Sequence, residues 1–160
     1  MRIIEGTRPA GGLKFAVVVS KYNDFVTDRL QKGALAALAH FGVRDDDVTV
    51  IRVPGAFEIP TAARLAADTN EFDGIVCLGC LIRGATPHFE YISSAVAHGL
   101  ITASGSTGIP MAFGVLTTNS AEEALERAVD GPSNKGWEAV QATVEMAIIA
   151  GELSGITSAE

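Results

Sequence analysis

The sequence predicts an α/β domain in which helices cover both faces of a parallel sheet. Short apolar segments alternate along the chain with longer segments of helical periodicity. The short segments are apolar without alternation, which is typical of strands buried on both faces of a parallel sheet. Right-handed crossovers between such strands place helices on both sides, so we expect a doubly wound, three-layer α/β/α sandwich.

One domain spanning residues 1–160 is expected. No linker-like, low-complexity or periodically repeated stretch interrupts the 160 residues, of which 48% are hydrophobic and 19% are charged. This composition is that of a globular protein, and the length is sufficient for a core of two or three layers.

The first core strand and its helix are expected near the start of the chain. Residues 3–4 read as a short strand at the sheet edge or against a neighbouring chain, and residues 14–20 as the first core strand. Asn23 or Asp24 then caps a helix with one apolar face, and Gly42 ends that helix.

The rest of the chain repeats this alternation. Further core strands, each apolar on both faces, are expected at residues 48–53, 73–81 and 111–116. Helices are expected up to about Ala67, from Pro87 as the first helical residue, and over residues 121–129. The inner face of the last helix is predicted to carry Trp137, Val140, Val144, Ile148 and Gly151.

Net charge and the lengths of the apolar runs exclude several classes of function. A formal net charge of -7 argues against a nucleic acid or an anionic membrane surface as partner, since both are bound through clustered Lys and Arg. The longest unbroken apolar run, residues 15–19, is too short to span a bilayer. Residues 1–6 lack the charged and apolar regions of a signal peptide, so the expected location is the cytoplasm.

Cys77 and Cys80 form a Cys-x-x-Cys motif of the kind found in redox and zinc sites. Their odd spacing within a strand sends the two side chains to opposite faces of the sheet, and no second cysteine pair exists to complete a zinc site. We therefore prefer a buried apolar role, and no metal is expected.

The strongest functional signal is the stretch of residues 78–89, where a buried strand leads into a helix. Its turn contains Arg83, Gly84, Thr86 and His88, which offer a cation, free backbone amides, a hydroxyl and an imidazole. Such a turn binds anions, because the first amides of a helix lack partners and the helix dipole is positive there. The same dipole favours a neutral imidazole that can take or pass a proton. We expect this turn to handle a phosphate and a proton together.

Unusual side chains also follow the neighbouring strands, and ligands of parallel sheets bind at these carboxyl ends. Tyr22 and Phe57 are either loop anchors in the core or rings that stack on a flat heterocycle. Glu58 either complements the dipole of the next helix or accepts hydrogen bonds from the hydroxyls of a polyol.

Three cations near these strand ends have more than one interpretation. Arg83 is either a surface cation or part of a phosphate cradle. Arg127 lies four residues after Glu123, which by spacing alone predicts a solvated ion pair. Lys135 lies near the start of the last helix, where a cation opposes the dipole, so another partner is expected.

Signatures of several nucleotide-binding families are missing. The chain has no Gly-x-Gly-x-x-Gly after its first strand, no Walker loop and no cluster of metal ligands. Residues 20–24 stand where a flavodoxin has its Ser-, Thr- and Gly-rich phosphate loop and where a receiver domain has its acidic pair. A dinucleotide oxidoreductase or a signalling receiver is therefore not expected.

Three motifs follow one another in the chain. They are Gly-Ala-Phe-Glu-Ile-Pro at residues 55–60, Gly-Cys-Leu-Ile-Arg-Gly-Ala-Thr-Pro-His-Phe at 79–89, and Phe-Gly-Val-Leu-Thr-Thr at 113–118. Together they closely resemble the 6,7-dimethyl-8-ribityllumazine synthase family of riboflavin biosynthesis. The resemblance covers nearly the whole chain, and it implies a flavodoxin-like fold with a parallel four-stranded sheet and an added N-terminal edge strand.

The resemblance also implies a transferase that uses no metal or redox cofactor. Its substrates would be 5-amino-6-(D-ribitylamino)uracil and 3,4-dihydroxy-2-butanone 4-phosphate, and its products 6,7-dimethyl-8-(D-ribityl)lumazine, phosphate and water. The pyrimidine ring and ribityl chain would contact Tyr22, Asn23, Ala56, Phe57, Glu58, Cys80, Leu81, Ile82 and Phe113. The ketone phosphate would contact Ala85, Thr86, Arg127 and Lys135, a role that replaces the local ion-pair interpretation of Arg127. His88 would carry protons.

An assembly is implied as well. Phe113 and Arg127 would reach the site of a neighbouring subunit, so pentamers are expected, and hollow icosahedral shells of pentamers are the expected larger form. Riboflavin synthase is a candidate partner. Two other classes share part of the pattern. A non-catalytic flavin- or lumazine-binding carrier would use the aromatic pocket but would not need Arg83, Thr86 and His88 beside it, and a purely structural shell protein would need neither the pocket nor these residues.

Overall fold

The computed structural model describes residues 1–159 and confirms the predicted parallel sheet. Its strands are β1 (Phe15–Ser20), β2 (Val48–Val53), β3 (Gly74–Ile82) and β4 (Met111–Thr118). They lie in the order β2-β1-β3-β4, and every neighbouring pair is parallel. The carboxyl ends of all four strands therefore meet at one edge of the sheet.

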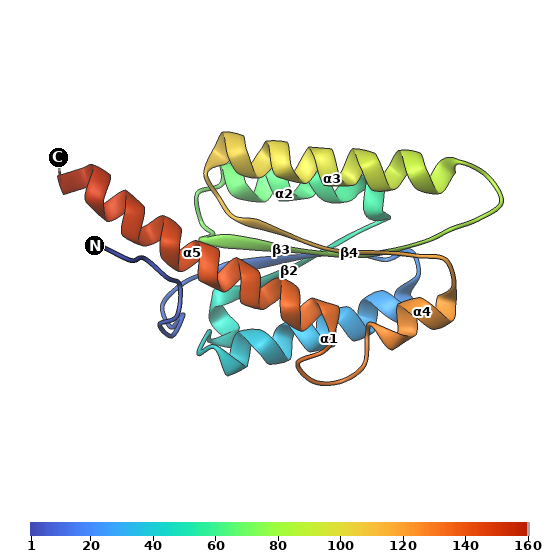
Figure 1. Ribbon diagram of the computed structural model, residues 1–160, viewed down its shortest axis with the longest axis horizontal. Coiled ribbons are helices and arrows are strands. Elements are labelled where there is room, and N and C mark those ends of the chain that lie inside the picture. Colours follow the sequence, from blue (N-terminus) through green and yellow to red (C-terminus); the bar gives the residue numbers. More distant parts are fainter. Residues whose placement is uncertain (160) are drawn as a thin grey trace.

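Helices cover both faces of this sheet, as the three-layer prediction requires (Figure 1). One face carries α1 (Asp24–His40), α4 (Ala121–Glu126) and α5 (Lys135–Ala159), and the other carries α2 (Ile59–Asp68) and α3 (His88–Thr107). Two short 3-10 helices, η1 (Asp45–Asp47) and η2 (Ala56–Glu58), flank β2.

Two apolar cores lie on opposite sides of the sheet. The core under α1 and α5 includes Leu30, Leu78 and Ile148, and the core under α2 and α3 includes Ile59 and Ile75. Each such side chain is at most 1% exposed, and burial of one contributes about 2 kcal/mol to stability. These cores fix the strands rigidly, so the loops at the carboxyl ends are held in defined positions.

Residues 3–4 do not form the predicted edge strand in the single chain. Within residues 1–159 the sheet has four strands, and Ile3 is 72% exposed. The segment runs beside α5 instead, since a Cβ atom on Gly6 would lie 2.2 Å from the carbonyl oxygen of Glu145. A strand needs the hydrogen bonds of a partner, and residues 3–4 have no strand partner here.

The prediction that β2 is buried on both faces was wrong. Thr49, Val50 and Arg52 are exposed, whereas all six residues of β1 are buried. The cause is position, because β2 is an edge strand and β1 is central. Arg52 uses this exposure to pair with Asp28 of α1, with 3.0 Å between its Nη2 atom and the Asp28 Oδ1 atom.

Two predictions about the last helices were also wrong. α4 ends at Glu126, not at residue 129, because the chain turns back so that the Lys135 N–H donates to the Arg127 carbonyl at 2.9 Å. Gly151 is exposed, since the C-terminal part of α5 extends past the sheet (Figure 1). The remaining predicted inner residues of α5 are buried or half-buried.

Residues 135–156 of α5 are long and apolar enough to cross a membrane, judged by length and composition alone. The packing of this helix gives another explanation for its apolar character. Val140, Val144 and Ile148 are buried in the core formed with α1 and the sheet. Core helices of globular proteins share this composition.

Candidate functional site

A cavity of about 730 Å³, here called the strand-end pocket, lies at the carboxyl ends of β1, β2 and β3. Its wall includes these predicted site residues: Tyr22, Asn23, Ala56, Phe57, Glu58, Cys80, Leu81, Ile82, Thr86 and His88. The parallel topology explains the meeting of segments that are distant in sequence, because each segment follows a strand at the same edge of the sheet.

The rings of Tyr22 and Phe57 do not anchor loops in the core. They are 71% and 62% exposed and line the strand-end pocket. The N–H of Tyr22 donates to the carbonyl of Pro54 at 3.1 Å, which holds the end of β1 beside the end of β2. Of the two interpretations of these rings, the open pocket wall favours a stacking surface.

Asn23 is the N-cap residue of α1, as predicted, but its side chain connects two strand ends and does not cap the helix. Its Nδ2 atom donates to the carbonyl oxygen of Cys80 at 2.8 Å, and its side chain makes no cap bond. The backbone of Asn23 is left-handed, with φ of 60°, a conformation that Asn tolerates better than most residues. The amide therefore ties the Tyr22 loop to β3.

The end of β3 presents backbone groups to the strand-end pocket. β1 pairs with β3 only as far as Val19 opposite Leu78, while β3 continues to Ile82 beside β4. Residues 79–82 of β3 therefore extend past the last residue pair of the β1–β3 ladder. Backbone N–H and C=O groups there can read the polar edge of a ring.

The Cys-x-x-Cys motif is structural in this fold. Cys77 belongs to the core under α2 and α3, and Cys80 to the core under α1 and α5, so the side chains point to opposite faces as predicted. Both thiols are free. Burial raises the pKa of the Cys80 thiol to about 11, which keeps it neutral at physiological pH.

Glu58 occupies the N-cap position of α2 without a side-chain cap hydrogen bond. Its side chain is exposed and lines the strand-end pocket. A Cβ atom on Gly55 would lie 3.2 Å from the Glu58 Oε2 atom, so the carboxylate lies over the preceding turn. This placement suits acceptance of hydrogen bonds from ligand hydroxyls.

The turn between β3 and α3 forms one wall of the same pocket. α3 begins at His88, so Pro87 is its N-cap and not the predicted first helical residue. Thr86 and His88 line the pocket, and Ala85 lies exposed on the turn between them and Gly84. The first N–H groups of α3 have no partners within the helix, so this end can bind an anion.

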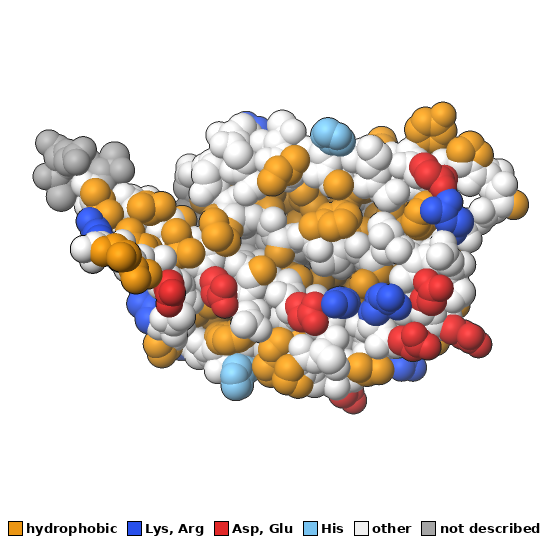
Figure 2. Space-filling model, viewed as in Figure 1, with side chains coloured by type: hydrophobic (Ala, Val, Ile, Leu, Met, Phe, Trp, Pro, Cys, Tyr) orange, Lys and Arg blue, Asp and Glu red, His pale blue; other side chains and the backbone are white. Residues whose placement is uncertain are grey.

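A second cavity of about 420 Å³, here called the β4 pocket, runs along β4 and the start of α5. Phe113, Arg127 and Lys135 line it. Figure 2 shows this face, where a band of hydrophobic side chains lies between α3 and α5 with charged groups of both signs along its lower border. The structure thus separates these three predicted residues from the strand-end pocket.

The Glu123–Arg127 ion pair that spacing suggested is absent among the described residues. The Glu123 carboxylate accepts from the N–H of Asn119 at 3.0 Å, and the Nη1 atom of Arg127 donates to the Glu123 backbone carbonyl at 2.9 Å. Ser120 caps α4 through its side-chain oxygen. The carboxylate of Glu123 therefore serves the helix start, and the Arg127 charge faces the β4 pocket.

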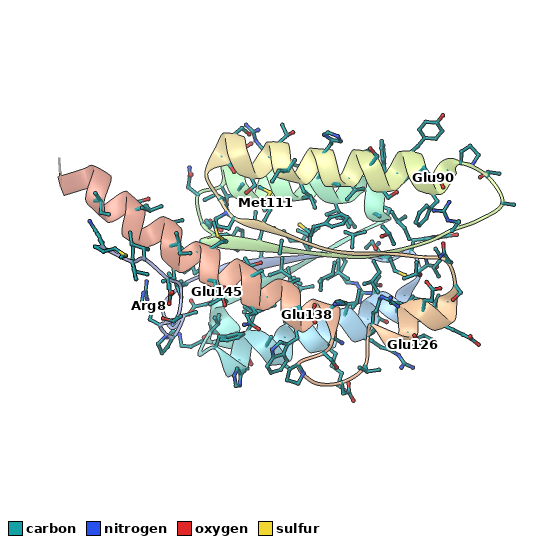
Figure 3. The ribbon with its side chains drawn as sticks, viewed as in Figure 1. Arg8, Glu90, Met111, Glu126, Glu138 and Glu145 are labelled. Carbon is teal, nitrogen blue, oxygen red and sulfur yellow. The ribbon has the colours of Figure 1, made fainter. Side chains whose placement is uncertain are left out.

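Sequence reasoning missed Glu138 and Asn134. The Nζ atom of Lys135 lies 2.8 Å from the Glu138 Oε2 atom, which is the partner expected for this lysine. Figure 3 shows Glu138 on the N-terminal part of α5. Asn134 is buried, caps α5 by accepting from the Gly136 N–H at 2.7 Å, and donates to the carbonyl of Arg29 at 3.2 Å. The i,i+3 spacing and the N-cap rule could have identified both.

Within the described part of the chain, no three His, Cys, Asp or Glu residues cluster as metal ligands would. The two pockets instead combine aromatic rings, two carboxylates, an imidazole and two cations. Stacking, hydrogen bonding to hydroxyls, phosphate binding and proton transfer are the chemistry that these groups support.

Comparison with known proteins gives consistent matches over most of the chain. Residues 12–150 match the family model described as 6,7-dimethyl-8-ribityllumazine synthase. A protein of that name from Syntrophus aciditrophicus (strain SB) is 50% identical over 144 residues, which cover 90% of this chain and 94% of the relative. Another from Desulfatibacillum aliphaticivorans is 45% identical over 149 residues, which cover 93% and 96%.

Proposed function

The chain belongs to the 6,7-dimethyl-8-ribityllumazine synthase family, and we propose that it catalyses the penultimate step of riboflavin biosynthesis. In this reaction 5-amino-6-(D-ribitylamino)uracil condenses with 3,4-dihydroxy-2-butanone 4-phosphate. The observation that carries the proposal is the strand-end pocket, where stacking rings, open strand backbone and a helix start that binds anions meet.

The pyrimidine substrate occupies the strand-end pocket in this proposal. Its ring stacks against Tyr22, and its polar edge is read by the backbone of residues 80–82, which lies beyond the β1 ladder. The ribityl hydroxyls donate to Glu58, beside Ala56 and Phe57. Asn23 supports this arrangement indirectly, because its amide is bonded to the carbonyl of Cys80.

The phosphate of the second substrate binds at the start of α3. One chain supplies the backbone N–H groups of residues 85–86, the hydroxyl of Thr86 and the dipole of α3. Arg127 and Lys135 supply cations from the β4 pocket of a neighbouring copy. Charge-assisted hydrogen bonds of this kind are stronger than neutral ones, so two cations can hold a dianion firmly.

The chemistry proceeds by proton transfers around bound substrates. The 5-amino group attacks the ketone carbonyl, and loss of water gives an imine. Removal of a proton from the adjacent carbon expels phosphate and leaves an enol, which tautomerises to a new ketone. The ribitylamino nitrogen attacks that ketone, and loss of a second water closes the lumazine ring. His88 moves the protons, and positioning supplies much of the acceleration.

We propose a homo-oligomer in which each site forms between two copies. Support comes from the separation of the two pockets in one chain and from the 47% exposure of Phe113, which lines the β4 pocket. Pentamers, and icosahedral shells of pentamers, are the proposed forms. A cytoplasmic location and riboflavin synthase as a partner belong to the same proposal. Light scattering distinguishes a pentamer from a shell by mass.

One assay tests the reaction. The purified chain is mixed with both substrates, and lumazine fluorescence and phosphate release are followed together. We expect both signals, in equal amounts, only when both substrates are present. A non-catalytic carrier would bind added lumazine without phosphate release, and a structural shell protein would do neither. Either result would overturn the proposal.

A further inference from the structure

Arg83 lies in the turn that we propose to bind phosphate, yet its guanidinium is held by other groups. Its Nε atom donates to the Oδ1 atom of Asn119 at 3.0 Å, and its Nη1 atom donates to the carboxylate of Glu90. Its Cζ atom lies 4.7 Å from the centre of the Phe89 ring. The backbone N–H of Arg83 donates to the carbonyl of Thr118 at 2.8 Å.

These contacts join three elements around the turn. Glu90 lies in the first turn of α3, as Figure 3 shows, while Asn119 follows β4. Asn119 in turn donates its backbone N–H to Glu123 of α4, the helix that leads to Arg127. The guanidinium of Arg83 therefore spans the ends of β3 and β4 and the start of α3.

The ion pair of Arg83 with Glu90 also affects the electrostatics of the anion-binding turn. A carboxylate in the first turn of α3 repels a phosphate bound at the same helix end. Arg83 offsets that charge through a direct ion pair, in which both side chains are 49% exposed. Arg83 does not line the strand-end pocket, whereas Thr86 and His88 do.

We propose that Arg83 is a positioning residue that fixes the anion-binding turn and neutralises Glu90, and is not itself a phosphate ligand. The inference rests on the proposed function, because it concerns the phosphate-bearing substrate. It makes a distinctive prediction: the effect of losing Arg83 depends on whether Glu90 keeps its charge.

The test is a double-mutant cycle of Arg83→Gln and Glu90→Gln, with kinetics for each substrate. For Arg83→Gln we expect KM for the butanone phosphate to rise about fivefold, with KM for the pyrimidine within about twofold of wild type. The double variant should recover about half of this loss, because the charge of Glu90 is gone but the bond that ties the turn to Asn119 is still missing. Arg83→Lys, which keeps the charge but loses the planar fork, should lie between.

A direct phosphate ligand would behave differently. In that case Glu90→Gln would free the guanidinium and lower KM, and the double variant would be as impaired as Arg83→Gln alone. That result, or an unchanged KM in Arg83→Gln, would overturn the proposal. Arg44→Gln is the matched control, since Arg44 pairs with Asp47 at 2.9 Å before the amino end of β2.

Binding of inorganic phosphate, measured by calorimetry, separates this inference from the proposed reaction. The proposed reaction fails if wild type produces no lumazine, whatever its phosphate affinity. The proposed role of Arg83 fails if wild type is active but Arg83→Gln and the double variant bind phosphate with the same affinity. We expect the affinity to follow the order of the KM values.

Discussion

The strand-end pocket and the β4 pocket contain complementary halves of one chemistry. The first has stacking rings, a carboxylate and an imidazole but no Lys or Arg in its wall. The second has Arg127 and Lys135 beside Phe113, with a single carboxylate that pairs with the lysine. A phosphate-bearing substrate that reacts with an aromatic amine needs both sets of groups. In one chain these two sets of groups lie in separate pockets, and this separation is why we propose a site that forms between two copies.

Loss of the Arg127 charge should give the largest effect. No carboxylate among the described residues pairs with this guanidinium, so its charge is available to the phosphate. We expect Arg127→Ala to lower kcat/KM for the butanone phosphate about fiftyfold, mainly through KM. Steady-state kinetics with that substrate varied measures this. Lys32→Ala, which removes an exposed cation paired with Asp130 at 3.3 Å, is the control.

His88 should affect turnover more than binding. The imidazole lies in the pocket wall beside the turn, and we propose that it moves protons between the amine and the ketone there. We expect His88→Ala to lower kcat about tenfold, with either KM changed less than about threefold. His98→Ala, on the exposed face of the same helix, should leave kcat unchanged. Equal turnover in both variants would remove His88 from the mechanism.

The ring at position 22 should matter for the pyrimidine alone. We expect Tyr22→Ala to weaken binding of the uracil substrate about fivefold, while Tyr22→Phe stays within about twofold, because stacking needs the ring face and not the hydroxyl. Fluorescence titration measures the affinity. If the two variants bind equally well, Tyr22 does not stack on the substrate.

The buried thiol of Cys80 should give the smallest effect, and on stability only. Burial raises the folded-state pKa to about 11, from 9.0 for a free thiol, so the unfolded chain loses this proton first. The free energy of unfolding therefore does not depend on the ionisation of this thiol below pH 9.0, and it falls as the pH rises from 9.0 toward about 11. Urea unfolding across this range should show a shallower decline for Cys80→Ala than for wild type. An identical decline would contradict the assignment.

Sequence patterns predicted the strands and helices because each element is periodic and locally consistent. The same patterns could not distinguish the edge strand β2 from the central strand β1. An apolar, β-branched segment predicts a strand, but it does not show how many neighbouring strands or helices will cover it. Residues 3–4 illustrate the limit further, since a strand exists only where a partner supplies hydrogen bonds.

Position at strand ends also predicted which residues would gather in the strand-end pocket. Local spacing misled for Glu123, whose carboxylate accepts from the Asn119 N–H. Asn23 is the N-cap residue of α1 as predicted, but its amide donates to Cys80 on the neighbouring strand β3 and does not cap the helix. The Glu123 contact is a local helix cap that competes with the ion pair, and the Asn23 contact joins segments far apart in sequence. The spacing of two residues along the chain predicts neither contact.

Complementation between two impaired variants tests most directly the proposal that each site forms between two copies. His88→Ala combined with Tyr22→Ala disables the strand-end pocket, and Arg127→Ala disables the β4 pocket. The two chains are unfolded, mixed in equal amounts and refolded together. If each site draws its halves from different chains, about a quarter of the sites in random oligomers are intact, and activity returns to about a quarter of wild type. Activity no greater than the sum of the two variants refolded apart would contradict the account.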